Sequence, residues 1–414
     1  MRRHSYRIEL GLLAALLSVS VRAVELVSPI DNAEVDLVPK VQRQVMALPT
    51  LAERLATFTG DGQEVRELRR SKNWCRAQPL VLTWRAESGE RGPWKVSIGR
   101  RSDLSDARVE VFASRPNTNG IVTCVFPRAN LLLGTCYYWQ VSCAMRKAGW
   151  SFERECALAA ATGGCSAVGT FKTADTVPRW IEIEGRVKNI RDLGGRIGLN
   201  GCRVRQGMIF RGQGLNDNSP APGCRGRNRL TVEDVDYLTR TLGIRTDLDL
   251  RTEQETCRME GSPLGRAVRL VSCDSESYRG IFSPKGKKSM AAAFRVFCDR
   301  ANYPIYFHCI SGASRTGSLA YVLNGILGVS RQELETDWES TYYPDIPDAD
   351  PNPERWNRES HFNDGFAGYG APDDTWGRRI ELYLLECGVR PEEIAAFREI
   401  MLEQRFSTQK ELNS

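Results

Sequence analysis

A ten-residue segment from His308 to Gly317 constrains the fold of this chain more than any other feature. It reads His-Cys-Ile-Ser-Gly-Ala-Ser-Arg-Thr-Gly, and it is preceded by Tyr306-Phe307 and followed by a helix-like run at 318–323. This order predicts a strand, a loop of small residues and the start of a helix. In that arrangement the loop N–H groups converge on one point, where the helix dipole adds positive potential. The segment therefore predicts an anion site between a strand and a helix.

The side chains of the same segment predict a nucleophile beside an oxyanion-binding group. Cys309 in a positive field should be a thiolate near neutral pH, and the Thr316 hydroxyl can donate a hydrogen bond to it. Arg315 can fork two hydrogen bonds onto a phosphate-like dianion. His308 is expected to fix the cysteine backbone rather than to act as a general base. The alternative is a buried structural cysteine beside a surface arginine, which leaves the flanking His, Gly and Thr-Gly unexplained.

The segment resembles the signature loop of the cysteine-dependent protein tyrosine phosphatases, His-Cys-x5-Arg-Thr-Gly. Three other segments resemble a bacterial branch of that superfamily. Asn189 to Gly195 resembles its Asn-Phe-Arg-Asp-Leu-Gly-Gly motif, Met208 to Gly212 its Tyr/Phe-Arg-Ser motif, and Asp249 to Glu255 its Asp-Leu-Arg-Ser-x-x-Glu motif. The resemblance covers about residues 180–405 and includes Asp337 to Ser340 beyond the loop. It implies an α/β phosphatase domain that uses a cysteinyl-phosphate intermediate and needs no metal or other cofactor.

One departure from that branch lies inside the loop. The branch usually has Lys-Asp just before the loop arginine, whereas Ala313 and Ser314 stand there in this chain. The lysine would add a cation for highly phosphorylated substrates or lipid head groups, so its absence argues against a phosphoinositide substrate. The aspartate is a candidate acid in that branch, so the acid of this chain should lie elsewhere.

Cleavage of a phosphate ester needs an acid for the leaving oxygen and later a base for water, and two carboxylates compete for this role. Asp274 lies 35 residues before Cys309, after a strand-like run, and its position resembles the acid loop of tyrosine and dual-specificity phosphatases. Asp249 lies at a strand end from which it could also reach the cleft. The alternatives are a solvated loop residue beside Cys273 for Asp274, and an ion pair with Arg251 for Asp249. Asp274 is the preferred acid.

The first 23 residues have the pattern of a secretory signal peptide. Arg2, Arg3 and Arg7 are followed by an almost wholly apolar run from Leu10 to Val21, and Val21-Arg22-Ala23 offers a cleavage site. The run is short for a membrane span, an uncleaved anchor is the alternative, and no later stretch could cross a bilayer. The expected location is therefore secreted or periplasmic, with no stable membrane span after cleavage.

Cysteine usage agrees with export. The thirteen cysteines divide into six in the first half of the chain, six in the second half, and Cys309. This count predicts several disulfides in each half and one free catalytic thiol, in pairings that the sequence leaves open. A reduced cytosolic protein with many buried thiols is the alternative. Only three histidines and no Cys-x2-Cys pair occur, so no metal site is expected.

The chain divides into two predicted domains after the signal peptide. Residues 24–176 contain short β-type runs separated by turns, which predict an all-β sandwich; Trp84 and the later aromatic strands resemble a fibronectin type III or immunoglobulin-like domain. Residues 177–414 alternate β-type and helical runs, as an α/β domain does. Within them, Thr231 is expected to cap one helix, and another helix is expected at 291–298.

These features predict an exported phosphomonoesterase of the tyrosine phosphatase type, which acts on phosphorylated proteins or small-molecule phosphates. The N–H groups expected to bind the phosphate oxygens belong to Ile310, Ser311, Gly312, Ala313, Ser314 and Arg315. The rivals are a non-catalytic phosphate-binding or adhesion protein and a sulfurtransferase. The intact Cys309 and Arg315 argue against the first, and the Arg-Thr-Gly ending argues against the second. The formal net charge of +6 comes without a basic stripe, so no nucleic-acid partner is expected.

Overall fold

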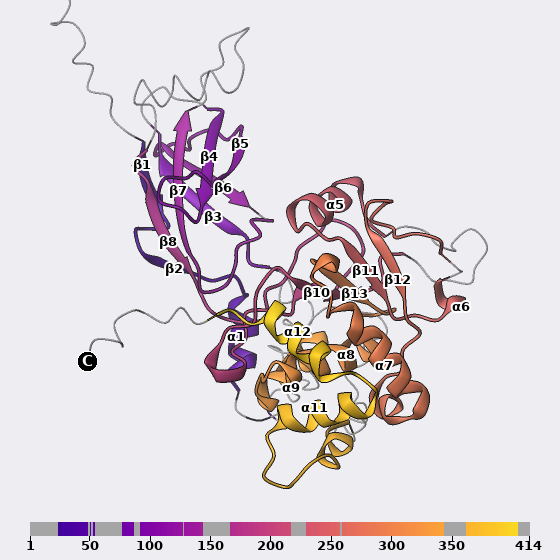
Figure 1. Cartoon of the computed structure of the whole chain (residues 1–414). Coiled ribbons are helices and arrows are strands. Elements are labelled where there is room, and N and C mark those ends of the chain that lie inside the picture. The colour runs from indigo at the N-terminus through magenta and orange to yellow at the C-terminus, as the bar shows by residue number, and fades with distance from the viewer. Residues whose placement is uncertain are drawn as a thin grey trace, which may run out of the picture. The chain divides into compact units, whose positions relative to one another are not determined.

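The computed structural model describes residues 24–48, 50, 53, 77–86, 92–126, 128–143, 166–216, 229–256, 259–342 and 362–404. The predicted signal peptide, residues 1–23, lies outside this set. The described residues form two compact units (Figure 1). The first takes in those of 1–35, 81–126 and 136–172, and the second those of 36–80, 127–135 and 173 onward. The domain boundary predicted after residue 176 stays a prediction.

The first unit is built on two antiparallel sheets whose strands bury alternate residues. One sheet has the order β1-β3-β6 and the other β2-β8-β7-β4-β5. The strands are β1 Glu25–Ser28, β2 Ala33–Val35, β3 Leu80–Arg85, β4 Trp94–Gly99, β5 Arg108–Phe112, β6 Ile121–Phe126, β7 Cys136–Cys143 and β8 Gly169–Thr173. Leu82 and Trp84 on β3 are buried, and the Trp84 ring meets that of Trp94 edge to face at 5.6 Å. This confirms a β-rich N-terminal region.

The second unit is built on one five-stranded sheet with the order β12-β11-β13-β10-β9. Its strands are β9 Arg191–Asp192, β10 Ile209–Gly212, β11 Thr246–Asp249, β12 Arg269–Ser272 and β13 Ile305–His308. All neighbours are parallel except β9 and β10. In register, His308 lies opposite both Gly212 and Asp249, and Asp249 lies opposite Ser272. The four parallel strands therefore end at one level, and the loops that follow them gather at one edge of the sheet.

Helices cover both faces of this sheet. The helices of the second unit are α1 Lys40–Met46, α5 Val232–Asp236, the π-helical η2 Tyr237–Thr241, α6 Glu253–Thr256, α7 Pro284–Val296, α8 Ser314–Ile326, α9 Arg331–Glu339, α11 Trp376–Glu386 and α12 Pro391–Met401. Its short 3-10 turns are η1 Leu199–Gly201, η3 Tyr278–Phe282, η4 Arg300–Asn302 and η5 Ser340–Tyr342. Phe307 packs in a core cluster with residues of α7, α8, α11 and α12, while Tyr306, its neighbour on β13, packs in a second cluster with residues of η2. Alternation along β13 thus supplies a core on each face. The sheet and its helices confirm the α/β class.

Two local expectations can be compared directly with these helices. Thr231 caps α5 as predicted: its side chain accepts from the Asp234 N–H, and Asp234 returns the bond to the Thr231 N–H. The helix expected at 291–298 begins earlier, at Pro284, because Ser283 caps it and proline suits the first turn.

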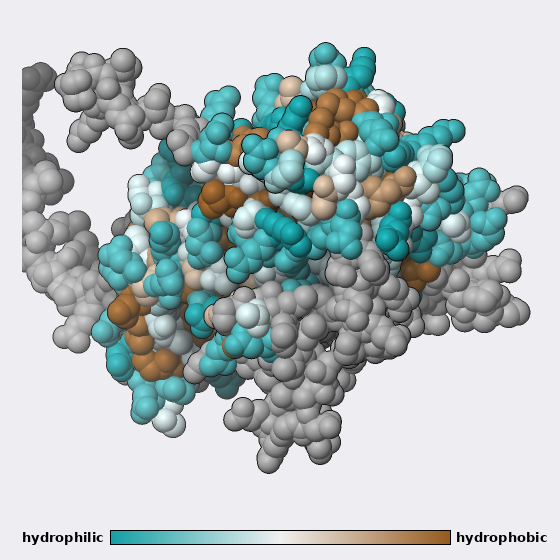
Figure 2. Space-filling model, turned by 90° about the horizontal axis from the view of Figure 1, so that it is seen from below, coloured by the Kyte–Doolittle hydropathy of each residue, from teal (hydrophilic) through white to brown (hydrophobic). Residues whose placement is uncertain are grey.

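The face of the molecule shown in Figure 2 is mainly hydrophilic, with the hydrophobic residues in separate patches. Among the described residues, no helix combines the length and the apolar character needed to cross a bilayer.

Candidate active site

The segment from His308 to Gly317 forms the predicted strand, loop and helix start. Cys309 follows β13 directly and is buried, and α8 begins at Ser314 with Ala313 as its N-cap. Gly312 has φ +70°, and a Cβ at this position would lie 2.4 Å from the carbonyl oxygen of Gly212. Only glycine suits this turn, because any side chain would meet both backbone strain and a backbone atom.

The surroundings of Cys309 favour the thiolate. Burial alone would raise the pKa of the Cys309 thiol, but the hydroxyl and N–H of Thr316, the charge of Arg315 and the Gly312 N–H together lower it. The buried Thr316 hydroxyl has no hydrogen-bond partner of standard geometry among the described residues, so it remains available to the sulfur. Donors from both the loop and the first turn of α8 therefore act on the sulfur.

Arg315 is held by a carboxylate from another loop. Its Nη1 donates to Glu255 Oε2 at 2.6 Å and its Nη2 to Glu255 Oε1 at 2.8 Å. Glu255 lies on α6, just beyond the end of β11, and its carboxylate also accepts from the Thr252 N–H. A guanidinium has five N–H donors. Two bind Glu255 and one reaches the Leu250 carbonyl oxygen at 3.5 Å, so Arg315 is oriented and keeps two donors for a ligand.

His308 contacts the backbone of the cysteine through one ring nitrogen and a buried aspartate through the other. Its Nε2 lies 2.9 Å from Asp247 Oδ1 and its Nδ1 lies 3.2 Å from the Cys309 carbonyl oxygen. Burial lowers the pKa of His308, but Asp249 and Asp247 raise it more, so the net shift is upward. A protonated ring donates from both nitrogens, which matches the acceptor that faces each of them.

The carbonyl of Gly312 is fixed from below the loop by two side chains. Asn189 Nδ2 donates to it at 3.1 Å and Arg211 Nη2 donates to it at 2.9 Å. Arg191 in turn donates to the side-chain oxygen of Asn189. With its carbonyl oxygen tied down, the loop can turn its N–H groups the other way, toward an anion.

A buried arginine cluster, formed by Arg191, Arg196 and Arg211, lies on a single carboxylate under this loop. Asp337 Oδ1 accepts from Arg191 Nε and Arg196 Nη2, both at 2.9 Å, and Oδ2 accepts from Arg211 Nη1 at 2.7 Å. Burial and the neighbouring Arg191 lower the pKa of Arg211 to about 9, against the opposing effect of Asp337 and Cys309. Three guanidinium groups and one carboxylate leave an excess of positive charge beside the loop of residues 309–315, called the phosphate loop below.

The structure favours the ion-pair alternative for Asp249. Its side chain is fully buried, and Arg251 surrounds it with four contacts, from the backbone N–H at 3.0 Å, from Nε at 2.9 and 3.1 Å, and from Nη2 at 2.6 Å. Burial would raise the pKa of Asp249, but His308 and Arg251 lower it overall. A carboxylate held in this way is a poor proton donor.

Asp274 lies on the loop that follows β12, at the same sheet edge as Cys309. Its carboxylate is 45% exposed and lies 3.3 Å from Lys285 Nζ, which also binds Glu276 at 2.8 Å. The next residue, Ser275, donates its N–H to the Leu250 carbonyl at 3.3 Å, and Arg315 Nη1 reaches the same oxygen at 3.5 Å. The Asp274 loop therefore lies beside the loop arginine.

Sequence reasoning assigned no role to Glu255 or to Asp337, although both stand in segments that resemble phosphatase motifs. Their partners are far along the chain: Glu255 is 60 residues from Arg315, and Asp337 is 146 residues from Arg191. The signal available was their place in those motifs, at Asp249 to Glu255 and at Asp337 to Ser340.

The disulfide prediction is not confirmed by the described cysteines. Seven have described side chains, and all are free thiols: Cys124, Cys136, Cys202, Cys273, Cys298, Cys309 and Cys387. The other six side chains lie outside the described part: Cys75, Cys143, Cys156, Cys165, Cys224 and Cys257.

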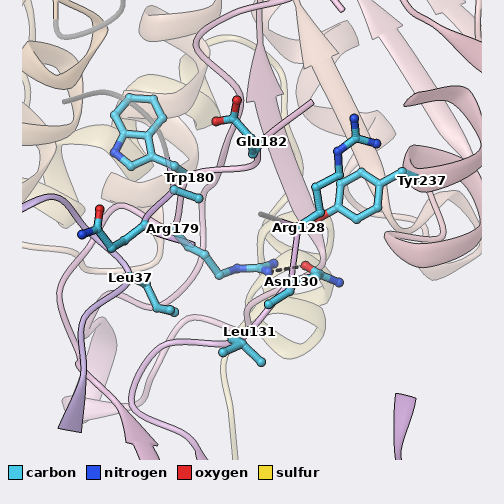
Figure 3. A pocket seen from close by; sticks show the side chains of 11 residues that line it. Leu37, Arg128, Asn130, Leu131, Arg179, Trp180, Glu182 and Tyr237 are labelled. Carbon is cyan, nitrogen blue, oxygen red and sulfur yellow. Dashed lines mark hydrogen bonds between the residues drawn. The ribbon is translucent and has the colours of Figure 1, made fainter. Parts of the chain in front are cut away.

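A pocket elsewhere in the second unit is lined in part by Arg179, whose charge is paired with a carboxylate of the protein (Figure 3). Its volume is about 360 Å³, including space open to solvent, and Trp180 and Arg179 help to line it. Arg179 donates to Asn130 at 2.6 Å and to Asp192 at 3.0 and 2.7 Å. The lining residues do not include the loop of 308–317, so this pocket is separate from the cysteine site.

Comparisons with known proteins bear on residues 181–403, the larger part of the second unit. A family model described as "Tyrosine phosphatase family" matches residues 181–403, more than half of the chain. A Cupriavidus necator protein named "Putative tyrosine-protein phosphatase" is 27% identical over 190 residues, which is 38% of this chain and 64% of that protein's length. The core catalytic domain of the PP-IP phosphatase SIW14 from S. cerevisiae, solved with citrate, matches 38% of this chain and 88% of its own at 16% identity and a TM-score of 0.23. The chain belongs to the tyrosine phosphatase family.

Proposed function

We propose that the chain is an exported phosphoric monoester hydrolase that works through a cysteinyl-phosphate intermediate on Cys309. One juxtaposition supports this most: the Cys309 thiol, whose pKa is lowered, and an arginine oriented by Glu255 belong to the same strand-loop-helix segment. A thiolate supplies the nucleophile, and Arg315 supplies donors for the phosphoryl oxygens.

The reaction would run in two steps. In the first, Cys309 Sγ attacks phosphorus; the P–S bond forms as the ester P–O bond breaks, and the leaving oxygen takes a proton from an acid. In the second, a water oxygen attacks phosphorus and gives a proton to the carboxylate left by the first step; the P–S bond breaks, the thiolate is restored and inorganic phosphate leaves. The loop N–H groups of residues 310–315 and Arg315 would hold the three equatorial oxygens in both steps.

We assign the acid to Asp274. Its carboxylate is partly exposed on a loop beside Arg315, whereas Asp249 is fully buried in its contacts with Arg251. The true acid can be recognised by leaving-group dependence, because only a poor leaving group needs the proton. Asp274→Asn should slow phenyl phosphate far more than p-nitrophenyl phosphate, and Asp249→Asn should slow both alike or destabilise the fold. The reverse pattern would make Asp249 the acid.

Three finer features belong to the same proposal. The substrates are phosphorylated proteins or small-molecule phosphates, and the N-terminal unit is a fibronectin type III or immunoglobulin-like sandwich that serves as a spacer or adhesion module. Export is proposed from the pattern of residues 1–23. N-terminal sequencing of the mature protein should begin at residue 24, and a mature protein that keeps Met1 would contradict export by a cleaved signal.

The function is tested by steady-state turnover of p-nitrophenyl phosphate in the presence of a chelator. Cys309→Ser should lose turnover, since an alcohol is a far weaker nucleophile than a thiolate near neutral pH. Cys202→Ser is the matched control, because Cys202 is a partly exposed free thiol outside the loop, and it should turn over as wild type does. Turnover by Cys309→Ser within about tenfold of wild type would refute the covalent mechanism.

A further inference from the structure

Tyr278 carries the most strained backbone near the candidate active site. It begins η3, four residues after Asp274, and its φ of +52° lies in the left-handed region. A bulky side chain adopts this conformation only where its surroundings hold it there. The contacts of Tyr278 show what holds it.

Two hydrogen bonds fix Tyr278 against the start of α8, and a ring contact fixes it against α9. Its hydroxyl lies 2.9 Å from Ser314 Oγ, and its N–H donates to Ser318 Oγ at 3.0 Å. Its ring packs on that of Trp338 with centroids 5.6 Å apart. Ser318 Oγ itself donates to the Ser314 backbone carbonyl at 2.9 Å, so the two serines and the tyrosine are joined by hydrogen bonds through both side chains and backbone.

Ser314 is part of the phosphate loop, because it stands immediately before Arg315 and opens α8. The hydroxyl of Tyr278 therefore joins the loop that carries Asp274 to the loop that carries the nucleophile. The Asp274 loop is also tied on the other side of the acid, where Cys273 donates its N–H to the Asp249 carbonyl at 2.8 Å. The short segment between these two hydrogen bonds contains Asp274. It can move only a short distance, since each residue spans at most about 3.6 Å.

We propose that Tyr278 is a positioning residue for the general acid: its bond to Ser314 holds the Asp274 loop against the phosphate loop while the leaving oxygen is protonated. This inference rests on the proposed function. It predicts a kinetic effect confined to substrates that need the proton, which a merely structural tie would not produce. The remaining contacts of Tyr278, with Ser318 and Trp338, keep the backbone in place when only the hydroxyl is removed.

The test compares kcat/KM for phenyl phosphate and p-nitrophenyl phosphate, because kcat/KM reports the steps up to P–O cleavage. Tyr278→Phe should lower kcat/KM for phenyl phosphate by about tenfold or more and that for p-nitrophenyl phosphate by less than about threefold. Ser314→Ala removes the other half of the bond and should show the same selectivity. The double variant should be no slower than the slower single variant, since both changes break one interaction.

Tyr321→Phe is the matched control. Tyr321 lies on α8, and its hydroxyl donates to Asn363 and accepts from Trp376, neither of which belongs to the loop of 308–317. This variant should leave the ratio of the two kcat/KM values as in wild type. Equal slowing of both esters by Tyr278→Phe, no slowing of either, or multiplicative effects in the double variant would overturn the inference. If Cys309→Ser is inactive while any of these results holds, the proposed function stands and only the role of Tyr278 falls.

Discussion

Replacing Asp337 by asparagine removes the carboxylate to which, in the described part of the chain, all three members of the buried arginine cluster donate. The formal charge of that cluster with Asp337 is +2, from three arginines and one carboxylate, and it becomes +3 in Asp337→Asn. Burial would raise the pKa of Asp337, yet the three arginines hold it well below the usual range of a carboxyl group. The carboxylate is therefore charged in the folded protein at any pH where the enzyme would work.

The expected loss in the free energy of unfolding is large, although Asp337→Asn replaces only one carboxylate oxygen by an NH2 group. Removing one partner of a buried ion pair costs about 3–5 kcal/mol, because the other charge stays buried without compensation. Asparagine keeps one carbonyl oxygen as an acceptor, so we expect a loss of about 3 kcal/mol in the free energy of unfolding at neutral pH. Since the folded pKa of Asp337 is lowered, its contribution is present above the unfolded pKa of about 3.9 and is lost as the pH falls below it. The difference between wild type and variant should shrink accordingly.

Urea unfolding of the full chain, followed by the helical circular dichroism signal, measures this loss. In the described part of the chain the α-helices belong to the second unit, so the signal follows that unit. Asp236→Asn is the control: Asp236 pairs with Arg240 on the surface, with side chains 53% and 83% exposed, and should change stability by less than about 0.5 kcal/mol. A loss below about 1 kcal/mol in Asp337→Asn would refute the idea that the cluster depends on this carboxylate.

Three more predictions concern the loop itself. Glu255→Gln weakens the contact that orients Arg315, and kcat/KM for p-nitrophenyl phosphate should fall by about tenfold or more; an unchanged value would show that the arginine is oriented otherwise. Gly312→Ala places a Cβ 2.4 Å from the Gly212 carbonyl oxygen, so vanadate inhibition and turnover should both be lost, and normal inhibition would contradict the loop geometry. Thr316→Ala removes a group that lowers the pKa of Cys309, so the pH profile of iodoacetate alkylation should move to higher pH, and Thr316→Ser should restore it.

The local parts of the site could be read from the sequence because they are continuous in the chain. Tyr306 to Gly317 encodes a buried strand, a loop of small residues and an apolar helix without a gap, and β13 and α8 follow that order. The cap of α5 is equally local, since Thr231 and Asp234 are three residues apart. Such features depend on nearest neighbours and need no knowledge of the tertiary fold.

The parts that the sequence left open depend on contacts between distant segments. The choice between Asp274 and Asp249 as the acid rests on burial. From the sequence alone, Arg251 could bind either Asp249 or a substrate, and only the structure shows that Arg251 encloses Asp249. The start of α7 was missed for another reason. Its first turn carries Lys285 and Lys287, whose charges oppose the helix dipole, and the capping bond from Gly286 to Ser283 shows only in the structure.

The central claim, a phosphoryl group carried by Cys309, can be measured directly. Wild-type protein is mixed with p-nitrophenyl phosphate, quenched within the first turnovers under conditions that preserve thiophosphate esters, digested and examined by mass spectrometry. A phosphoryl adduct on the peptide that contains Cys309, absent from Cys309→Ser, is the expected result. Turnover without that adduct, or with the phosphoryl group on a different residue, would contradict the claim.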